Sequence, residues 1–279
     1  MQLTVQGQTA YAYTGGKPFD ATLPCVVFIH GALHDHSVWT LLARWCAHHG
    51  NSVLAVDQPG HLRSAGPLQP SVQALADWTL ALLDAAGVGA DQTTAVVGHS
   101  MGSLIALQAA ATAPDKISRL ALVGSVAPMP VAAPLLDATL TDRNKAHAMI
   151  NQWSYAPRAQ LGASSIPGLC LTALNERLMQ RQAPGVLHTD MAACNAYTEG
   201  FDAAAQVRCP TLLLSSAQDR MTPPKAIEPL AKAFTGGAPL TRIILPDAGH
   251  AMMSEAPGAV LDALWNFAST PAQPTWAHQ

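Results

Sequence analysis

The sequence has few charged residues and no long apolar run. Only 12% of its 279 residues are Asp, Glu, Lys or Arg, about half the share that is usual in soluble domains. The 15 basic and 18 acidic residues are mixed along the chain, so there is no basic patch of the kind that nucleic-acid binding requires. Apolar stretches such as residues 120–127 and 209–214 end well before the ~18 residues that a membrane-spanning helix needs. We therefore expect neither a nucleic-acid partner nor a membrane span.

Paired cysteines and a secretory signal are also missing. Residues 1–16 have no basic start followed by an apolar segment, and they alternate like a strand. The cysteines are odd in number, scattered and never spaced as C-x-x-C: Cys25, Cys46, Cys170, Cys194 and Cys209. This pattern argues against a zinc site or a complete disulfide framework and for reduced, mostly buried thiols. We expect a cytoplasmic protein.

Short β-rich apolar runs alternate with helical patterns along most of the chain. Runs that are apolar on both sides are typical of parallel strands covered on both faces. They occupy residues 25–29, 52–56, 94–97, 120–124, 211–215 and 241–245, after an N-terminal hairpin at 3–13. The helical patterns occupy residues 38–48, 71–86, 101–113, 224–234 and 257–269. The sequence therefore predicts an α/β fold with a doubly wound, mostly parallel β-sheet.

Residues 131–206 interrupt this alternation. They contain no strand-like run but carry helical patterns at 135–152 and 169–182. A long helical crossover is one interpretation, but roughly 80 residues is far more than a crossover needs. We expect instead a helical cap at 131–206, inserted into a core formed by residues 1–130 and 207–279.

A G-x-S-x-G pentapeptide, GHSMG at residues 98–102, follows one of these runs and opens a helix. Between a strand and a helix, this motif forms a sharp turn that holds the serine hydroxyl clear of the sheet, at the positive end of the helix dipole. Ser100 is therefore the candidate nucleophile.

A serine hydroxyl needs a base and an orienting carboxylate to become a nucleophile. His250 lies in the loop after the last predicted strand, and Asp219 follows the strand before it. With Ser100 they give the chain order Ser, Asp, His of a known triad arrangement. Asp247 and Asp57 are the rival carboxylates, although each is better placed to shape its own loop. We expect Ser100, Asp219 and His250 to form a catalytic triad.

Acyl transfer also needs N–H donors for the oxyanion. The backbone N–H of Met101 follows the nucleophile, and that of Ala32 follows the His-Gly pair that ends the strand at 25–29. We expect these two groups to form an oxyanion hole. Leu33, His34 and Trp153 are candidate residues of the substrate pocket.

The run His34-Asp35-His36 could be read as metal ligands. Adjacent loop residues rarely converge on one ion, however, so the sequence implies no metal.

Together these motifs resemble the α/β-hydrolase fold superfamily, and in particular its capped serine esterase and lactonase branch. The resemblance extends over about residues 1–270 and also includes DQPGH at 57–61, QDRMTPP at 218–224 and PDAGH at 246–250. In this family, the dehalogenase and epoxide hydrolase branches carry an aspartate at the position of Ser100. The serine therefore excludes both branches. Family members usually carry a Gly where this chain has Leu62, a departure that concerns the loop around it.

The resemblance and the triad imply a serine hydrolase of small to medium carboxylic esters or lactones. The reaction would pass through an acyl-enzyme, with a small-molecule substrate and no cofactor. One alternative keeps the triad but cleaves a C–C bond of a vinylogous diketo acid, or acts like a hydroxynitrile lyase. C–C cleavage would need a cation for the substrate carboxylate, and Arg177 and Arg181 are candidates. Another alternative is a non-catalytic ligand receptor on the same fold.

Overall fold

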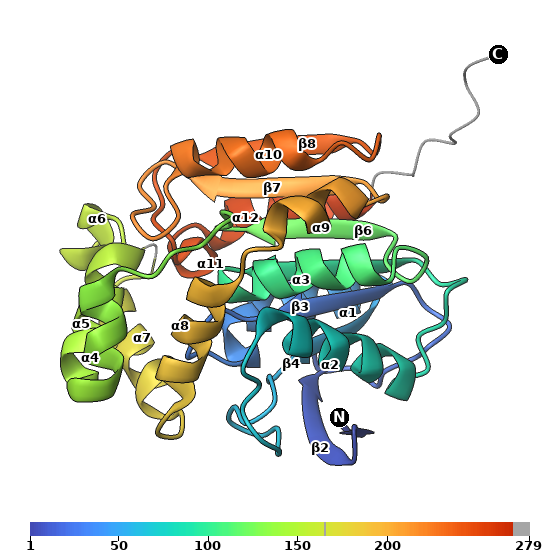
Figure 1. Cartoon of the computed structure of the whole chain (residues 1–279), viewed down its shortest axis with the longest axis horizontal. Coiled ribbons are helices and arrows are strands. Elements are labelled where there is room, and N and C mark those ends of the chain that lie inside the picture. Colours follow the sequence, from blue (N-terminus) through green and yellow to red (C-terminus); the bar gives the residue numbers. More distant parts are fainter. Residues whose placement is uncertain (165, 270–279) are drawn as a thin grey trace.

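A twisted β-sheet organises the molecule in the computed structural model, which describes residues 1–164 and 166–269 (Figure 1). The described residues form an eight-stranded sheet of order β1-β2-β4-β3-β5-β6-β7-β8. β1 and β2 pair antiparallel, β2 pairs antiparallel with β4, and the strands from β4 to β8 are parallel to one another. The strands are β1 (Gln2–Val5), β2 (Gln8–Tyr13), β3 (Cys25–Ile29), β4 (Ser52–Val56), β5 (Thr94–His99), β6 (Arg119–Val123), β7 (Thr211–Ser216) and β8 (Leu240–Leu245). The predicted α/β fold with a mostly parallel sheet is confirmed.

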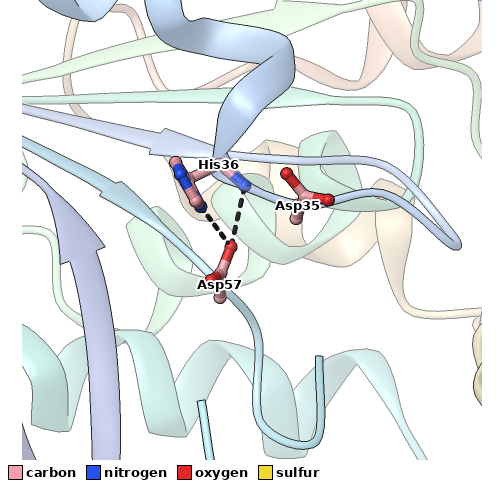
Figure 2. Close-up of side chains that lie close together, drawn as sticks. All are labelled: Asp35, His36 and Asp57. Carbon is pink, nitrogen blue, oxygen red and sulfur yellow. Dashed lines mark hydrogen bonds and ion pairs between the residues drawn. The ribbon is translucent and has the colours of Figure 1, made fainter. Parts of the chain in front are cut away.

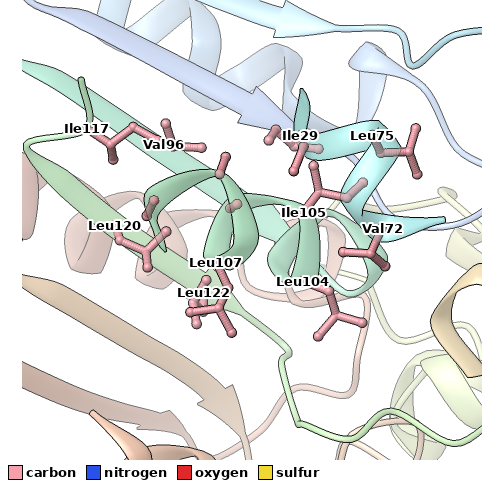
Figure 3. Close-up of a cluster of buried hydrophobic side chains, with 14 of the residues drawn as sticks. Ile29, Val72, Leu75, Val96, Leu104, Ile105, Leu107, Ile117, Leu120 and Leu122 are labelled. Carbon is pink, nitrogen blue, oxygen red and sulfur yellow. The ribbon is translucent and has the colours of Figure 1, made fainter. Parts of the chain in front are cut away.

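The two faces of the sheet bury separate apolar clusters, because alternate strand residues point to opposite sides. In β3, Val27 and Ile29 join one cluster and Val26 and Phe28 join the other. Figure 3 shows the first cluster, with Leu104 and Ile105 of the central helix among the side chains that fill it. The helices in contact with this face are α2 (Val72–Ala85), α3 (Met101–Thr112), α9 (Gly200–Gln206) and α10 (Glu228–Ala233), the last preceded by η2 (Pro224–Ile227). The other face is covered by η1 (His36–Trp39), α1 (Thr40–His48), α11 (Met252–Glu255) and α12 (Pro257–Ser269).

Between β6 and β7 the chain leaves the sheet as a run of helices. We call α4 to α8 the helical insertion: α4 (Ala133–Thr141), α5 (Arg143–Ser154), α6 (Pro157–Gln160), α7 (Leu171–Gln180) and α8 (Val186–Ala196). It lies beyond the carboxyl ends of the parallel strands (Figure 1). The helix expected at 135–152 is two helices, because Asp142 ends α4 and its carboxylate caps α5 by accepting the Lys145 N–H at 3.0 Å.

The boundaries expected for a cap, 131–206, stay a prediction. α9, at the end of that range, packs on α3 and α10, which cover the sheet. Residue 165 of the expected cap and residues 270–279 of the expected core lie outside the described residues.

The composition predicts unpaired, mostly buried thiols and no membrane-spanning segment. All five cysteines are unpaired, and four of them are buried while Cys170 is exposed. Within the described part of the chain, no helix combines the length and the apolar character needed to cross a bilayer.

Candidate active site

The turn between β5 and α3 holds Ser100 in a strained backbone conformation. Its φ of 53° lies in the left-handed region, which side chains other than glycine rarely adopt. The Ser100 N–H donates to the carbonyl of Val123 in β6 at 3.0 Å, which fixes the turn to the sheet. A Cβ atom at Gly98 would overlap the backbone of Gly102, and one at Gly102 would overlap that of Ile29. Only glycines therefore permit this turn, as the sequence motif predicts.

His250 and Asp219 meet at the carboxyl ends of β8 and β7. Nδ1 of His250 lies 2.8 Å from Oδ2 of Asp219, and both side chains are buried. The Asp219 Oδ1 atom accepts the backbone N–H groups of Met221 at 2.8 Å and Thr222 at 2.7 Å. Because a carboxylate accepts from Nδ1–H, the Nε2 atom of His250 is left free to take a proton.

Thr222 is a functional candidate that the sequence analysis missed. Its hydroxyl donates to Asp219 Oδ2 at 2.7 Å and lies 3.1 Å from Nδ1 of His250. The hydroxyl therefore fixes the position of both partners. The sequence carries a signal for this role. An Asp side chain in a loop often accepts backbone N–H groups of residues that follow closely, which brings Thr222 next to the carboxylate of Asp219.

The imidazole of His250 packs beside the Ser100 turn. A Cβ at Gly124, the residue after the Val123 carbonyl that holds Ser100, would lie 3.1 Å from Cε1 of His250. His99 donates from Nε2 to the His250 carbonyl at 2.9 Å, and the two rings are 4.6 Å apart. Burial, and then the neighbouring His250, lower the pKa of His99 well below its usual value. His99 is thus a neutral structural neighbour of His250.

The loop after β3 lies against this turn. His30 Nδ1 donates to the Gly31 carbonyl at 2.8 Å, while His30 Nε2 accepts the Gln58 N–H at 3.1 Å. Burial lowers the pKa of His30 to about 4, so the ring is neutral and can both donate and accept. In a trans peptide the N–H points opposite to the C=O, so the Ala32 N–H points away from His30. A Cβ at Gly31 would contact Ser100 at 3.1 Å, which places this loop against the serine.

A cavity of about 330 Å³ opens at Ser100. Its walls combine Ala32, Thr222, residues 129–132 and three elements of the helical insertion. From the insertion come Leu135, Trp153, Met191 and Cys194, so most of the lining is apolar. Ser100 makes no hydrogen bond through its hydroxyl among the described residues, so this group is available to a ligand.

The three residues expected in the pocket take different places. Trp153 lines the cavity. Leu33 is 1% exposed and packs into the apolar cluster of the helical insertion, which also contains the lining residues Leu135 and Met191. His34 binds the Ala32 carbonyl and Asn175, and with His250 it borders a separate cavity of about 30 Å³. Leu33 and His34 are not among the lining residues of this cavity, and their part in substrate binding stays a prediction.

Arg220 is a second residue that the sequence analysis missed. It lines the cavity next to Met221, and its guanidinium contacts the Gln152 carbonyl at 3.5 Å. Arg177 and Arg181, the cations considered for a substrate carboxylate, lie elsewhere. Arg181 pairs with Asp35 and Ser37, and Arg177 contacts Gln180.

The carboxylates that rival Asp219 are engaged in other roles. Asp247 is exposed on its loop. Asp57 accepts the backbone N–H of His36 at 2.9 Å and lies 2.7 Å from Nδ1 of the same residue. Its Oδ2 atom also accepts the Arg63 N–H at 3.3 Å, so Asp57 shapes the loop after β4 and ties it to the loop after β3.

Asp35, His36 and Asp57 come together as the one His/Asp cluster in residues 1–164 and 166–269 with metal-like spacing (Figure 2). His34, part of the run weighed as metal ligands, is not in it. The Asp35 carboxylate is held by both nitrogens of the Arg181 fork at 2.7 and 3.0 Å. Asp57 is bonded to His36 and Asp35 to Arg181, so both carboxylates have hydrogen-bond partners, as a structural network requires.

Comparisons with known proteins agree with this architecture. A protein of Caulobacter sp. (strain K31), a candidate carbamate hydrolase called RutD, is 30% identical over 231 residues, which cover 78% of this chain and 80% of its own. The corresponding protein of Klebsiella pneumoniae (strain 342) is 28% identical over 213 residues, 71% of this chain and 74% of its own. The crystal structure of the enol-lactonase from Burkholderia xenovorans LB400 matches with a TM-score of 0.81 at 20% identity, covering 97% of this chain and all of the other.

A family model matches residues 26–263, a span that contains the strained serine turn, both partners of the His–Asp pair and the helical insertion. The model describes the alpha/beta hydrolase family. The chain therefore belongs to the alpha/beta hydrolase family.

Proposed function

We propose that the protein is a serine hydrolase that cleaves small to medium carboxylic esters or lactones through an acyl-enzyme. The observation that carries this proposal is the position of Ser100. Its strained turn exposes to an apolar cavity a hydroxyl that has no other partner in the described part of the chain, beside a buried His250–Asp219 pair. A strained backbone at a cavity is where catalytic groups concentrate.

The proposed reaction begins when Nε2 of His250 takes the Ser100 proton as Oγ attacks the carbonyl carbon. Asp219 keeps the proton of the imidazole on Nδ1 and stabilises the imidazolium. The N–H groups of Ala32 and Met101 would bind the oxyanion of the tetrahedral intermediate, since neither is used in a hydrogen bond in the described structure. His250 then protonates the leaving alcohol, and water activated by the same imidazole releases the acid.

The cavity favours an apolar acyl group. A volume of about 330 Å³ is at the lower end for small-molecule sites, which measure roughly 300–1,000 Å³. The lining by Leu135, Trp153 and Met191 offers little to a strongly polar substrate. The proposed partner is therefore a small-molecule ester or lactone.

A carbamate is a second candidate substrate, because the two relatives carry the name of carbamate hydrolases. Its carbonyl can be attacked by the same serine and bound by the same donors. Carbon–carbon cleavage would need a cation within the cavity, and there only Arg220, among the lining residues described, could bind a substrate carboxylate.

A substrate panel with p-nitrophenyl butyrate, an enol lactone, an aryl carbamate and a vinylogous diketo acid separates these reactions. The proposal predicts the highest kcat/KM for the ester or the lactone, with a burst of p-nitrophenol equal to the enzyme concentration when deacylation limits turnover. Preference for the diketo acid would overturn the ester assignment. Stoichiometric ligand binding without turnover of any member of the panel would favour a receptor.

A further inference from the structure

The first peptide group of the loop after β3 is held from within the core. The Gly31 carbonyl accepts from His30 Nδ1 at 2.8 Å and from the His34 N–H at 3.3 Å. These bonds fix the direction of the Ala32 N–H on the other side of the peptide plane.

The second peptide group, between Ala32 and Leu33, is held from the helical insertion. The Ala32 carbonyl accepts from His34 Nδ1 at 2.8 Å, and His34 Nε2 lies 2.7 Å from Oδ1 of Asn175 in α7. The Leu33 N–H donates to Oδ2 of Asp190 in α8 at 2.8 Å. Both ends of this peptide therefore depend on α7 or α8.

Leu33 needs such support because its backbone is in the left-handed region, with a φ of 59°. That conformation is unfavourable for a leucine and persists only when surrounding contacts determine it. Asp190 is 157 residues away in the sequence, yet its carboxylate is the acceptor for this N–H. The acceptor that holds the loop thus belongs to the helical insertion.

Asp190 is itself held in place by His61. Its Oδ2 atom lies 3.0 Å from His61 Nε2, and the two side chains are 3% and 1% exposed. Burial alone would lower the pKa of His61, but Asp190 and the Pro59 carbonyl act in the opposite direction and leave that pKa above its usual value. The contact with His61 thus holds the Asp190 carboxylate beside the loop.

We propose that Asp190 is a positioning residue. Through the Leu33 N–H it holds the peptide that follows Ala32, and together with the bonds to the Gly31 carbonyl it keeps the Ala32 N–H in place. Asp190 thereby couples the helical insertion to the reaction centre. This proposal rests on the proposed function, in which the Ala32 N–H binds the oxyanion. The direction of the Ala32 N–H would then depend on the packing of α8 against the core.

Asp190→Ala tests this role. Loss of a whole oxyanion donor costs about 10²–10³ in kcat, and a donor that is misdirected but still present should cost less. We expect kcat to fall about tenfold to hundredfold with KM within about threefold of wild type. Asp190→Asn keeps an oxygen that can accept the Leu33 N–H, and it should restore most of kcat. Asp137→Ala, at an exposed site in α4, is the matched control and should be silent.

A transition-state analogue gives the readout that a merely structural role would not move. Affinity for a trifluoromethyl ketone, whose adduct with Ser100 places an oxyanion at the donors, should fall in proportion to kcat/KM across the three variants. Affinity for the product acid should stay within about twofold of wild type. Unchanged analogue affinity in a folded Asp190→Ala protein would overturn the proposal.

His34→Phe keeps the test decisive if Asp190→Ala does not fold. This variant removes the other hold on the same peptide and should lower kcat about tenfold with KM little changed; an unchanged kcat would count against positioning. Failure of the proposed function has a different signature, because hydrolysis would then survive Ser100→Ala. If hydrolysis depends on Ser100 but both Asp190→Ala and His34→Phe keep wild-type kinetics, only the positioning role of Asp190 is refuted.

Discussion

Nδ1 of His250 lies 2.8 Å from Oδ2 of Asp219, and the hydroxyl of Thr222 donates to that same oxygen at 2.7 Å. Two backbone N–H groups bind the other carboxylate oxygen. These bonds set the orientation of the imidazole, which in the proposed reaction would lower the reorganisation needed.

Thr222→Val should disturb this pair without disturbing the fold. Valine has nearly the shape of threonine but no hydroxyl, so Asp219 loses a donor and His250 loses a neighbour at 3.1 Å. We expect kcat to fall about tenfold with KM little changed, as for supporting hydrogen bonds in other sites, and a loss of about 1 kcal/mol in the free energy of unfolding.

Steady-state kinetics with p-nitrophenyl butyrate and urea denaturation measure the two effects. Thr222→Ser retains the hydroxyl and should recover most of kcat. Equal losses in the Ser and Val variants would mean that packing of the methyl group matters, and not the hydrogen bond.

Trp153→Ala should change acyl-chain preference. Trp153 lines the cavity from α5, so its removal enlarges the space near Ser100. We expect kcat/KM for p-nitrophenyl octanoate to rise relative to that for the butyrate by about tenfold, because the enlarged cavity should bury about two further CH₂ groups at about 0.8 kcal/mol each. Trp45→Ala removes a half-exposed tryptophan of α1 and should leave the ratio unchanged. The same chain-length ratio in both variants would show that Trp153 does not bound the acyl site.

Arg181→Met should destabilise the protein in a pH-dependent way. Burial would raise the pKa of Asp35, but hydrogen bonds from Ser37 and Arg181 lower it to about 2. A carboxyl whose folded pKa lies below its unfolded value adds stability above the unfolded value, about 3.9, and loses it as pH falls toward the folded value. The variant should be about 1–2 kcal/mol less stable at neutral pH, and the difference should shrink between about pH 4 and pH 2.

Urea denaturation across this pH range measures the difference. Arg177, in α7 just before Arg181, contacts the neutral side chain of Gln180 at 3.4 Å, so Arg177→Met should change stability by less than about 0.5 kcal/mol. A deficit of the Arg181 variant that is independent of pH would assign its effect to packing alone.

The features that could be predicted from the sequence are those that local residue patterns determine. The apolar runs mark strands β3 to β7 because both faces of the sheet are covered there, whereas β8 is an edge strand with several exposed residues. Ser100, Asp219 and His250 follow β5, β7 and β8, so the topology of a parallel sheet brings their loops to one edge.

Contacts between distant segments account for what could not be predicted. Leu33 was expected in the pocket because it follows the loop donor, but its positive φ and the bond to Asp190 turn its side chain into the apolar cluster of the helical insertion. Asp190 and Asn175 carry no local motif for this role, because the loop residues that they bind, Leu33 and His34, are more than 100 residues away. The break at Asp142 was overlooked because apolar periodicity continues across it, whereas the cap depends on one side chain.

The most direct test of the central claim is active-site labelling of Ser100→Ala. Wild-type protein treated with a fluorophosphonate should gain one adduct, located by peptide mass spectrometry at Ser100, and should lose hydrolysis of p-nitrophenyl butyrate in step with labelling. The variant should fold normally by circular dichroism, resist labelling and show at least about a thousandfold lower kcat. Undiminished ester hydrolysis by folded Ser100→Ala, or an adduct at another residue that abolishes activity, would contradict the account.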